Sequence, residues 1–136
     1  MKRNYLLFAV ALTLLITTAS AQTVKVKANI PFSFVVNRAT MPPGEYMVES
    51  MDHDGGVLAI RDSNSKTTNL VTSNACQSPK AAAHTKLIFH RYGDRYFLSQ
   101  VWVQGNDRGR ELLRSAREIE VAKDFSVQQV VLIAGR

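Results

Sequence analysis

Arginine side chains are the residues best suited to a chemical role in this chain, and they gather in its last third. Four of them lie close together in sequence, at Arg108, Arg110, Arg114 and Arg117. The last three are spaced i, i+4 and i+7, which would place them on one face of a helix. Guanidinium groups bind phosphates and carboxylates through paired, charge-assisted hydrogen bonds, so this stripe is a candidate contact for an anionic surface. Glutamates interleave with the arginines, and a salt-bridged face turned to solvent is the alternative.

A second basic group, Arg91 and Arg95, flanks a predicted tight turn at residues 93–94, with Tyr92 and Tyr96 beside it. Two arginines at a protruding turn would form a second candidate contact patch for an anionic partner. Cross-strand pairing of these side chains is the alternative. These six arginines are the predicted contact residues.

Nucleophiles and acids do not form a recognisable catalytic pattern. There is no Gly-x-Ser-x-Gly segment, and Ser63 precedes Lys66 with Ser-x-x-Lys spacing only in a predicted turn. Glu118 is expected on the helix among the arginines, so no acid has the apolar surroundings that a general acid needs. We therefore name no catalytic residue, and a hydrolase is the least favoured interpretation.

Metal and cofactor sites are also not indicated. His84 and His90 are six positions apart, roughly 20 Å along a strand at ~3.3 Å per residue, too far to share one zinc ion. His53 lies in a predicted turn whose two aspartates lack the closing glutamate of a calcium loop. No glycine-rich phosphate loop is present. We expect neither a metal nor a cofactor.

Cys76 is the only cysteine of the chain, so no disulfide can form within it. No Lys, Arg or His flanks it within residues 73–79, before Lys80, to lower the pKa of its thiol. A buried, unreactive thiol is expected, and a disulfide-linked dimer is the alternative.

The N-terminus has the three-part layout of a bacterial secretory signal peptide over residues 1–21. Lys2 and Arg3 precede an apolar run at residues 5–16, and small residues follow at 19–21. The run is shorter than the ~20 residues that span a bilayer, which favours a signal peptide over the alternative of a retained membrane anchor. No transmembrane helix is then expected after cleavage. A single β-rich domain over residues 22–136 would then work in the periplasm or outside the cell.

The predicted compartment and the net charge limit the classes of partner that we expect. The chain has 17 basic and 11 acidic residues, and loss of Lys2 and Arg3 lowers the formal charge from +6 to +4. A mildly basic domain outside the cytoplasm fits an anionic envelope component or another envelope protein, and nucleic acid is disfavoured. Ordinary solubility would explain the same charge.

Short apolar or alternating segments, separated by turn residues about every ten positions, predict a mainly β fold. We expect strands at residues 23–28, 30–36, 45–51, 57–61 and 67–73, and a connection at 76–84. The fold class expected is a small antiparallel β-sandwich or partly open barrel with one C-terminal helix.

The strongest structural signal is a hairpin over residues 85–103 around a type II′ turn at 93–94. The turn pairs Phe89 with Leu98, and the pairing is expected to continue in the same register along both strands. The face expected to meet the core carries Leu87, Phe89, Leu98 and Trp102.

A loop is expected at residues 105–109, a helix at 110–123 and a final strand at 125–134. The β-branched residues of the last segment favour a strand, and an extension of the helix is the alternative.

Three stretches, residues 31–36 with 41–46, then 87–98, then 109–112, resemble in this order a group of small, signal-peptide-bearing secreted bacterial proteins of uncharacterised function. The resemblance implies one secreted, β-rich domain and transfers no site residue. The sequence thus favours a non-enzymatic binding or structural module of the cell envelope. The alternative is a small β-barrel that carries an apolar ligand.

Overall fold

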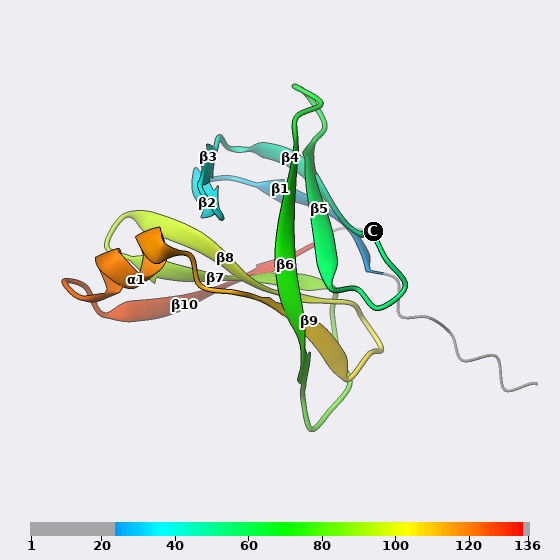
Figure 1. The fold of residues 1–136 in the computed structure, drawn as a ribbon. Coiled ribbons are helices and arrows are strands. Elements are labelled where there is room, and N and C mark those ends of the chain that lie inside the picture. The colour runs from blue at the N-terminus through cyan, green and yellow to red at the C-terminus, as the bar shows by residue number, and fades with distance from the viewer. Residues whose placement is uncertain (1–23, 135–136) are drawn as a thin grey trace, which may run out of the picture.

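A computed structural model of the chain describes residues 24–134, so the predicted signal peptide lies outside the described residues. The elements are ten strands and one helix (Figure 1): β1 (Lys25–Ile30), β2 (Phe34–Val36), β3 (Ala39–Met41), β4 (Gly44–Ser50), β5 (Val57–Asp62), β6 (Thr68–Gln77), β7 (Lys86–Tyr92), β8 (Arg95–Trp102), β9 (Arg108–Leu112), α1 (Ala116–Ala122) and β10 (Val127–Ile133). The expected mainly β fold with one helix is confirmed, and the sheet is not closed into a barrel.

The strands follow the order β1-β4-β5-β6-β9-β8-β2-β3, with β7 beside β8 and β10 beside β7. All pairs are antiparallel except β2 with β8. The ten-residue strand β6 belongs to both halves of the sheet. Its first part pairs with β5 and its last part, from Ser73 to Gln77, pairs with β9. Figure 1 shows β6 crossing from the layer of β1, β4 and β5 toward the layer of β7, β8 and β10.

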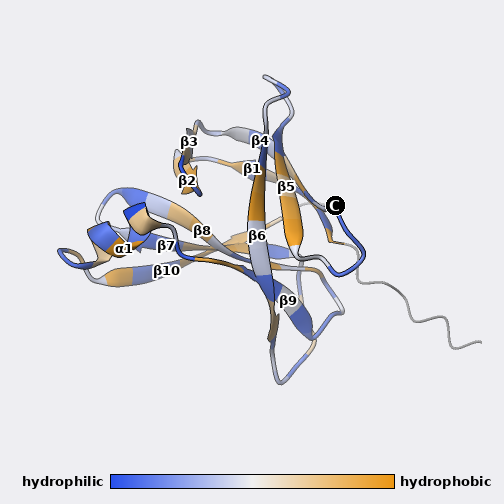
Figure 2. Ribbon diagram, in the orientation of Figure 1, coloured by the Kyte–Doolittle hydropathy of each residue, from blue (hydrophilic) through white to orange (hydrophobic). Residues whose placement is uncertain are grey.

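The core lies between these two layers and follows the period-two alternation of the strands. In β1, Val26, Ala28 and Ile30 are buried and the residues between them are exposed. Tyr46 from β4 and Phe89 from β7 are among the largest fully buried side chains. Figure 2 shows orange segments along β1, β5 and β6 and blue turns between strands, as burial of one strand face requires.

The predicted hairpin forms β7 and β8, and its turn has the expected type. Gly93 has φ 63°, and Asp94 is not among the residues with positive φ. A type II′ turn needs positive φ only at its first central residue, whereas type I′ needs it at both. The pairing of Phe89 with Leu98 is confirmed.

Beyond that pair the expected register is wrong by one residue. A β-bulge lies between Ile88 and Phe89, so Ile88 pairs with Gln100 and Ser99 is the extra residue. The insertion reverses the side-chain alternation. Trp102 therefore leaves the expected core face and pairs with Lys86 on the other face, where its indole N–H donates to Gln100.

Trp102 packs against the backbone of Gly109, and this contact leaves no room for a side chain. A Cβ atom at Gly109 would lie 2.7–2.8 Å from the indole ring. We expect Gly109→Ala to lower the free energy of unfolding by about 1–3 kcal/mol, because a buried ring must shift. Urea denaturation followed by the fluorescence of Trp102, the only tryptophan, measures this change. An unchanged midpoint would contradict the contact.

The helix expected over residues 110–123 is wrong in its first half. Residues 108–112 form β9, and α1 begins only at Ala116. Arg110 explains the difference, since it pairs with Ala75 of β6 on one side and Val101 of β8 on the other. Backbone pairing with two neighbours outweighs the helical spacing of the side chains.

Other boundaries differ less from the expectation. The last two residues of the loop expected at 105–109 belong to β9, and β6 continues to Gln77, into the expected connection at 76–84. The final segment is a strand, β10, as favoured. No helix within residues 24–134 is long and apolar enough to cross a membrane.

Candidate functional site

The fold does not keep the six predicted arginines in the two patches expected, the helix stripe and the hairpin tip. Arg110 is used internally, because its Nε donates to the Ser73 hydroxyl at 3.0 Å and its Nη2 to the Ser73 carbonyl at 2.7 Å. Arg91 is also engaged. Its Nε donates to the carbonyl of Gly93 at 2.7 Å, and its guanidinium lies 5.5 Å from the centre of the Tyr96 ring.

Arg108 and Arg114 line two different hollows. Arg108 borders a pocket of about 50 Å³ that also contains Asp54. Arg114 borders a pocket of about 140 Å³ beside Asn37 and Thr72. The predicted i, i+4, i+7 stripe therefore does not exist, since its residues come from a strand, a connection and a helix.

Arg95 and Arg117, in contrast, meet in one pocket although they come from the start of β8 and from α1. This Arg95–Arg117 pocket measures about 210 Å³. Its lining residues are Ser33, Phe34, Val35, Thr40, Asp94, Arg95, Tyr96, Phe97 and Arg117.

Both guanidinium groups of this pocket are exposed, and neither forms an ion pair within the described part of the chain. Arg117 Nη1 donates to the Thr40 hydroxyl at 3.3 Å. Asp94 adds one carboxylate to the lining, so the two arginines leave the pocket with a net positive charge.

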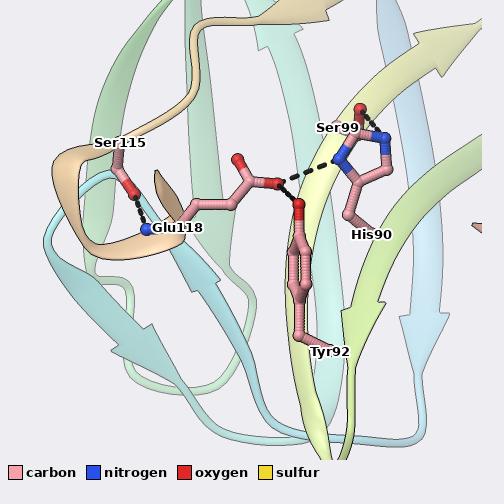
Figure 3. Close-up of polar contacts among 5 residues, drawn as sticks. All are labelled: His90, Tyr92, Ser99, Ser115 and Glu118. Carbon is pink, nitrogen blue, oxygen red and sulfur yellow. Dashed lines mark hydrogen bonds and ion pairs between the residues drawn. The ribbon is translucent and has the colours of Figure 1, made fainter. Parts of the chain in front are cut away.

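A second polar cluster, absent from the sequence prediction, joins α1 to the hairpin (Figure 3). Glu118 is only 5% exposed, and its Oε1 lies 2.9 Å from His90 Nδ1 and 3.2 Å from the Tyr92 hydroxyl. Glu118, which was expected on the helix among the arginines, is therefore buried against the hairpin instead. The same helical turn places Arg117 in the pocket and Glu118 in this cluster.

The cluster continues to Ser99, the extra residue of the bulge. Ser99 Oγ lies 3.1 Å from His90 Nε2. A carboxylate oxygen can only accept, so the ring proton facing Glu118 is on Nδ1. In the neutral ring Nε2 then accepts from the Ser99 hydroxyl.

This Ser99–His90–Glu118 chain has the order of contacts found in serine hydrolases. Ser99 is only 5% exposed, however, and none of the pockets described above includes it. A nucleophile needs an open position for the substrate carbonyl and donors for its oxyanion. Burial thus favours a structural role, in which the cluster fastens α1 onto the hairpin.

The protonation of Tyr92 fits the same role. Burial raises the pKa of its phenol above the ordinary value of 10.0, and the negative charge of Glu118 raises it further. The hydroxyl thus keeps its proton and donates a hydrogen bond to the carboxylate. Val121 of α1 packs beside Tyr92, with Val35 and Phe97, and forms the apolar part of the contact between α1 and the hairpin. We call this contact, together with the polar cluster around Glu118, the anchor.

A local sequence signal for this anchor was available. Residues 115–118 read Ser-x-x-Glu, the pattern of a helix N-terminus. Ser115 is indeed the N-cap, and its hydroxyl accepts from the Glu118 backbone N–H at 3.2 Å. The Glu118 carboxylate reaches toward β7, and only the fold reveals this second partner.

The remaining candidate residues do not form a site. Cys76 is half-buried and not fully buried as expected, and burial, followed by the charge of Glu111, raises the pKa of its thiol. Within residues 24–134, no three histidines, cysteines or acids are grouped as metal ligands. His53 and His84 are exposed in loops.

Comparison of the chain with protein-family models, with curated proteins and with solved structures finds no match, so its function must be argued from its own residues.

Proposed function

We propose that this chain is a non-enzymatic, extracytoplasmic binding module of the bacterial cell envelope, and that it contacts an anionic envelope component through the Arg95–Arg117 pocket. The location rests on the signal-peptide pattern of residues 1–21. The observation that carries the proposal is the presence of two guanidinium groups without ion-pair partners, among the described residues, in one pocket.

The chemistry of the pocket suits a carboxylate or phosphate attached to a small body. Two guanidinium groups provide donors for anionic oxygens, and the hydroxyls of Ser33 and Thr40 add neutral polar contacts. Phe34 and Val35 supply an apolar wall. A volume of about 210 Å³ is below the 300–1,000 Å³ of a drug-sized site, so we expect one acidic unit of a larger molecule to enter.

The supports of both arginines favour binding without rearrangement. Arg95 follows the tight turn of the hairpin, and Arg117 belongs to a helix that Glu118 and Val121 hold against β7 and β8. A backbone that is fixed in advance loses less conformational entropy when a ligand binds.

An apolar-ligand carrier has less support. The sheet is open, and large side chains such as Phe34 and Phe89 pack edge to face in the core at 5.7 Å between ring centres. A carrier barrel needs an enclosed interior that side chains leave free.

Binding is tested with two probes, polygalacturonate for carboxylates and phosphatidylglycerol vesicles for phosphates. We expect the double variant Arg95→Ala/Arg117→Ala to bind the preferred probe at least about tenfold more weakly, because each charge-assisted hydrogen bond contributes about 1.5–3 kcal/mol. The measurement is a titration at low and moderate salt.

The matched control is Arg108→Ala/Arg114→Ala, which removes the same charge from two exposed arginines outside the pocket. This control should retain most of the affinity. Equal losses of affinity in both double variants would show that net charge alone causes the effect and would contradict binding in the pocket.

A further inference from the structure

Three strands in the described part of the chain lie at open edges, each paired on one side only. They are β1, which pairs with β4, β3, which pairs with β2, and β10, which pairs with β7. An open edge presents unpaired backbone N–H and C=O groups to any further strand. Figure 1 shows β10 as the outermost strand of its layer.

Two of these edges carry the usual protection against further pairing, which is charge or shortness. Lys25 and Lys27 are exposed along β1. The edge strand β3 has only three residues.

The third edge, β10, has neither protection. Its seven residues, Val-Gln-Gln-Val-Val-Leu-Ile, include no charge and no proline. Val127, Val131 and Ile133 are 49%, 49% and 55% exposed. Val130 and Leu132, on the opposite face, are partly buried and pack against the core. An uncharged, largely apolar edge strand of seven residues is suited to pairing with another strand.

We propose that β10 is a dimerisation edge, on which β10 of a second copy of this chain pairs antiparallel across a twofold axis. No pair of this arrangement sets two charged residues opposite each other. With the axis at Val130, Val127 lies opposite Ile133 of the second copy, and both are apolar and on the same face.

Charge favours this occupant. A strand that pairs with itself sets like charges near one another, which is destabilising. In β10 that repulsion is absent, whereas the two lysines of β1 would oppose self-pairing there. The inference does not depend on the Arg95–Arg117 pocket, whose lining includes no residue of β10.

The test is the molar mass of the purified protein by sedimentation equilibrium, without reductant. We expect a dimer for the wild type and for Cys76→Ser, and a monomer for Val131→Lys. Circular dichroism checks that Val131→Lys keeps the fold, which we expect because Val131 is half exposed.

Leu70→Lys is the matched control, since Leu70 is 55% exposed, close to the 49% of Val131, but lies on the part of β6 that pairs with β5, away from the proposed edge. We expect this variant to remain dimeric. A monomeric wild type, a dimeric Val131→Lys, or loss of the dimer in Leu70→Lys would each overturn the proposal. Loss of the dimer in Cys76→Ser would overturn it in favour of a disulfide link.

Discussion

Glu118→Ala should lower the free energy of unfolding by about 3 kcal/mol, more than any other change of a polar side chain considered above. The alanine leaves His90 Nδ1 and the Tyr92 hydroxyl without their acceptor in a buried setting. Removal of one member of a buried charged or hydrogen-bonded group leaves the others unsatisfied, which is the expensive part of such a change. Urea denaturation of the two proteins at neutral pH measures the difference.

Two companion variants separate the anchor from a general effect of charge. Glu120→Ala removes an exposed acid of the same helix, paired only with Lys123, and should change the stability by less than about 0.5 kcal/mol. Glu118→Gln keeps one acceptor oxygen and should lie between the two. If Glu118→Ala and Glu120→Ala were equally mild, the anchor described above would not exist.

The same contact predicts how stability changes in alkaline solution. The pKa of Tyr92 is raised in the folded protein, so its contribution is fully present below the unfolded value of 10.0 and is lost as the pH rises through the folded pKa. Tyr46, whose pKa burial also raises, contributes in the same sense. In Glu118→Ala the alkaline loss should shrink but persist, because burial is the larger cause of the Tyr92 shift.

Phe89→Ala should have the largest effect among apolar changes, a loss of about 3–5 kcal/mol. The Phe89 ring is fully buried and lies edge to face with Phe32 at 4.9 Å between ring centres. Phe125→Ala removes an equal side chain that is 53% exposed and should lose much less. Thermal unfolding of both variants tests the placement of the core, and equal losses would contradict it.

Local patterns predicted the hairpin because its information is local. The turn at Gly93 and the alternation on both sides fix the strand pairing as far as Phe89 with Leu98. The bulge at Ser99 has another origin. β8 pairs with β7 on one side and with β9 and β2 on the other, so its register satisfies several neighbours at once. The sequence of a single strand does not contain the information that sets this register.

The sequence likewise predicted some features of the candidate site and not others. Arg95 and Arg117 were identified by residue type and charge, but their meeting in one pocket depends on where α1 lies. Glu118 was placed among solvent-facing arginines because a helix was expected from residue 110. Once β9 takes residues 108–112, the helix begins later and Glu118 turns toward β7.

The two pairings of strand β6 affect how the protein unfolds. Its first half hydrogen-bonds to β5 and its second half to β9, so the two layers share one continuous backbone segment. If either layer melts, β6 loses half of its partners and the other layer loses a border strand. The two layers should therefore melt together in a single cooperative transition, although each has its own strands and loops.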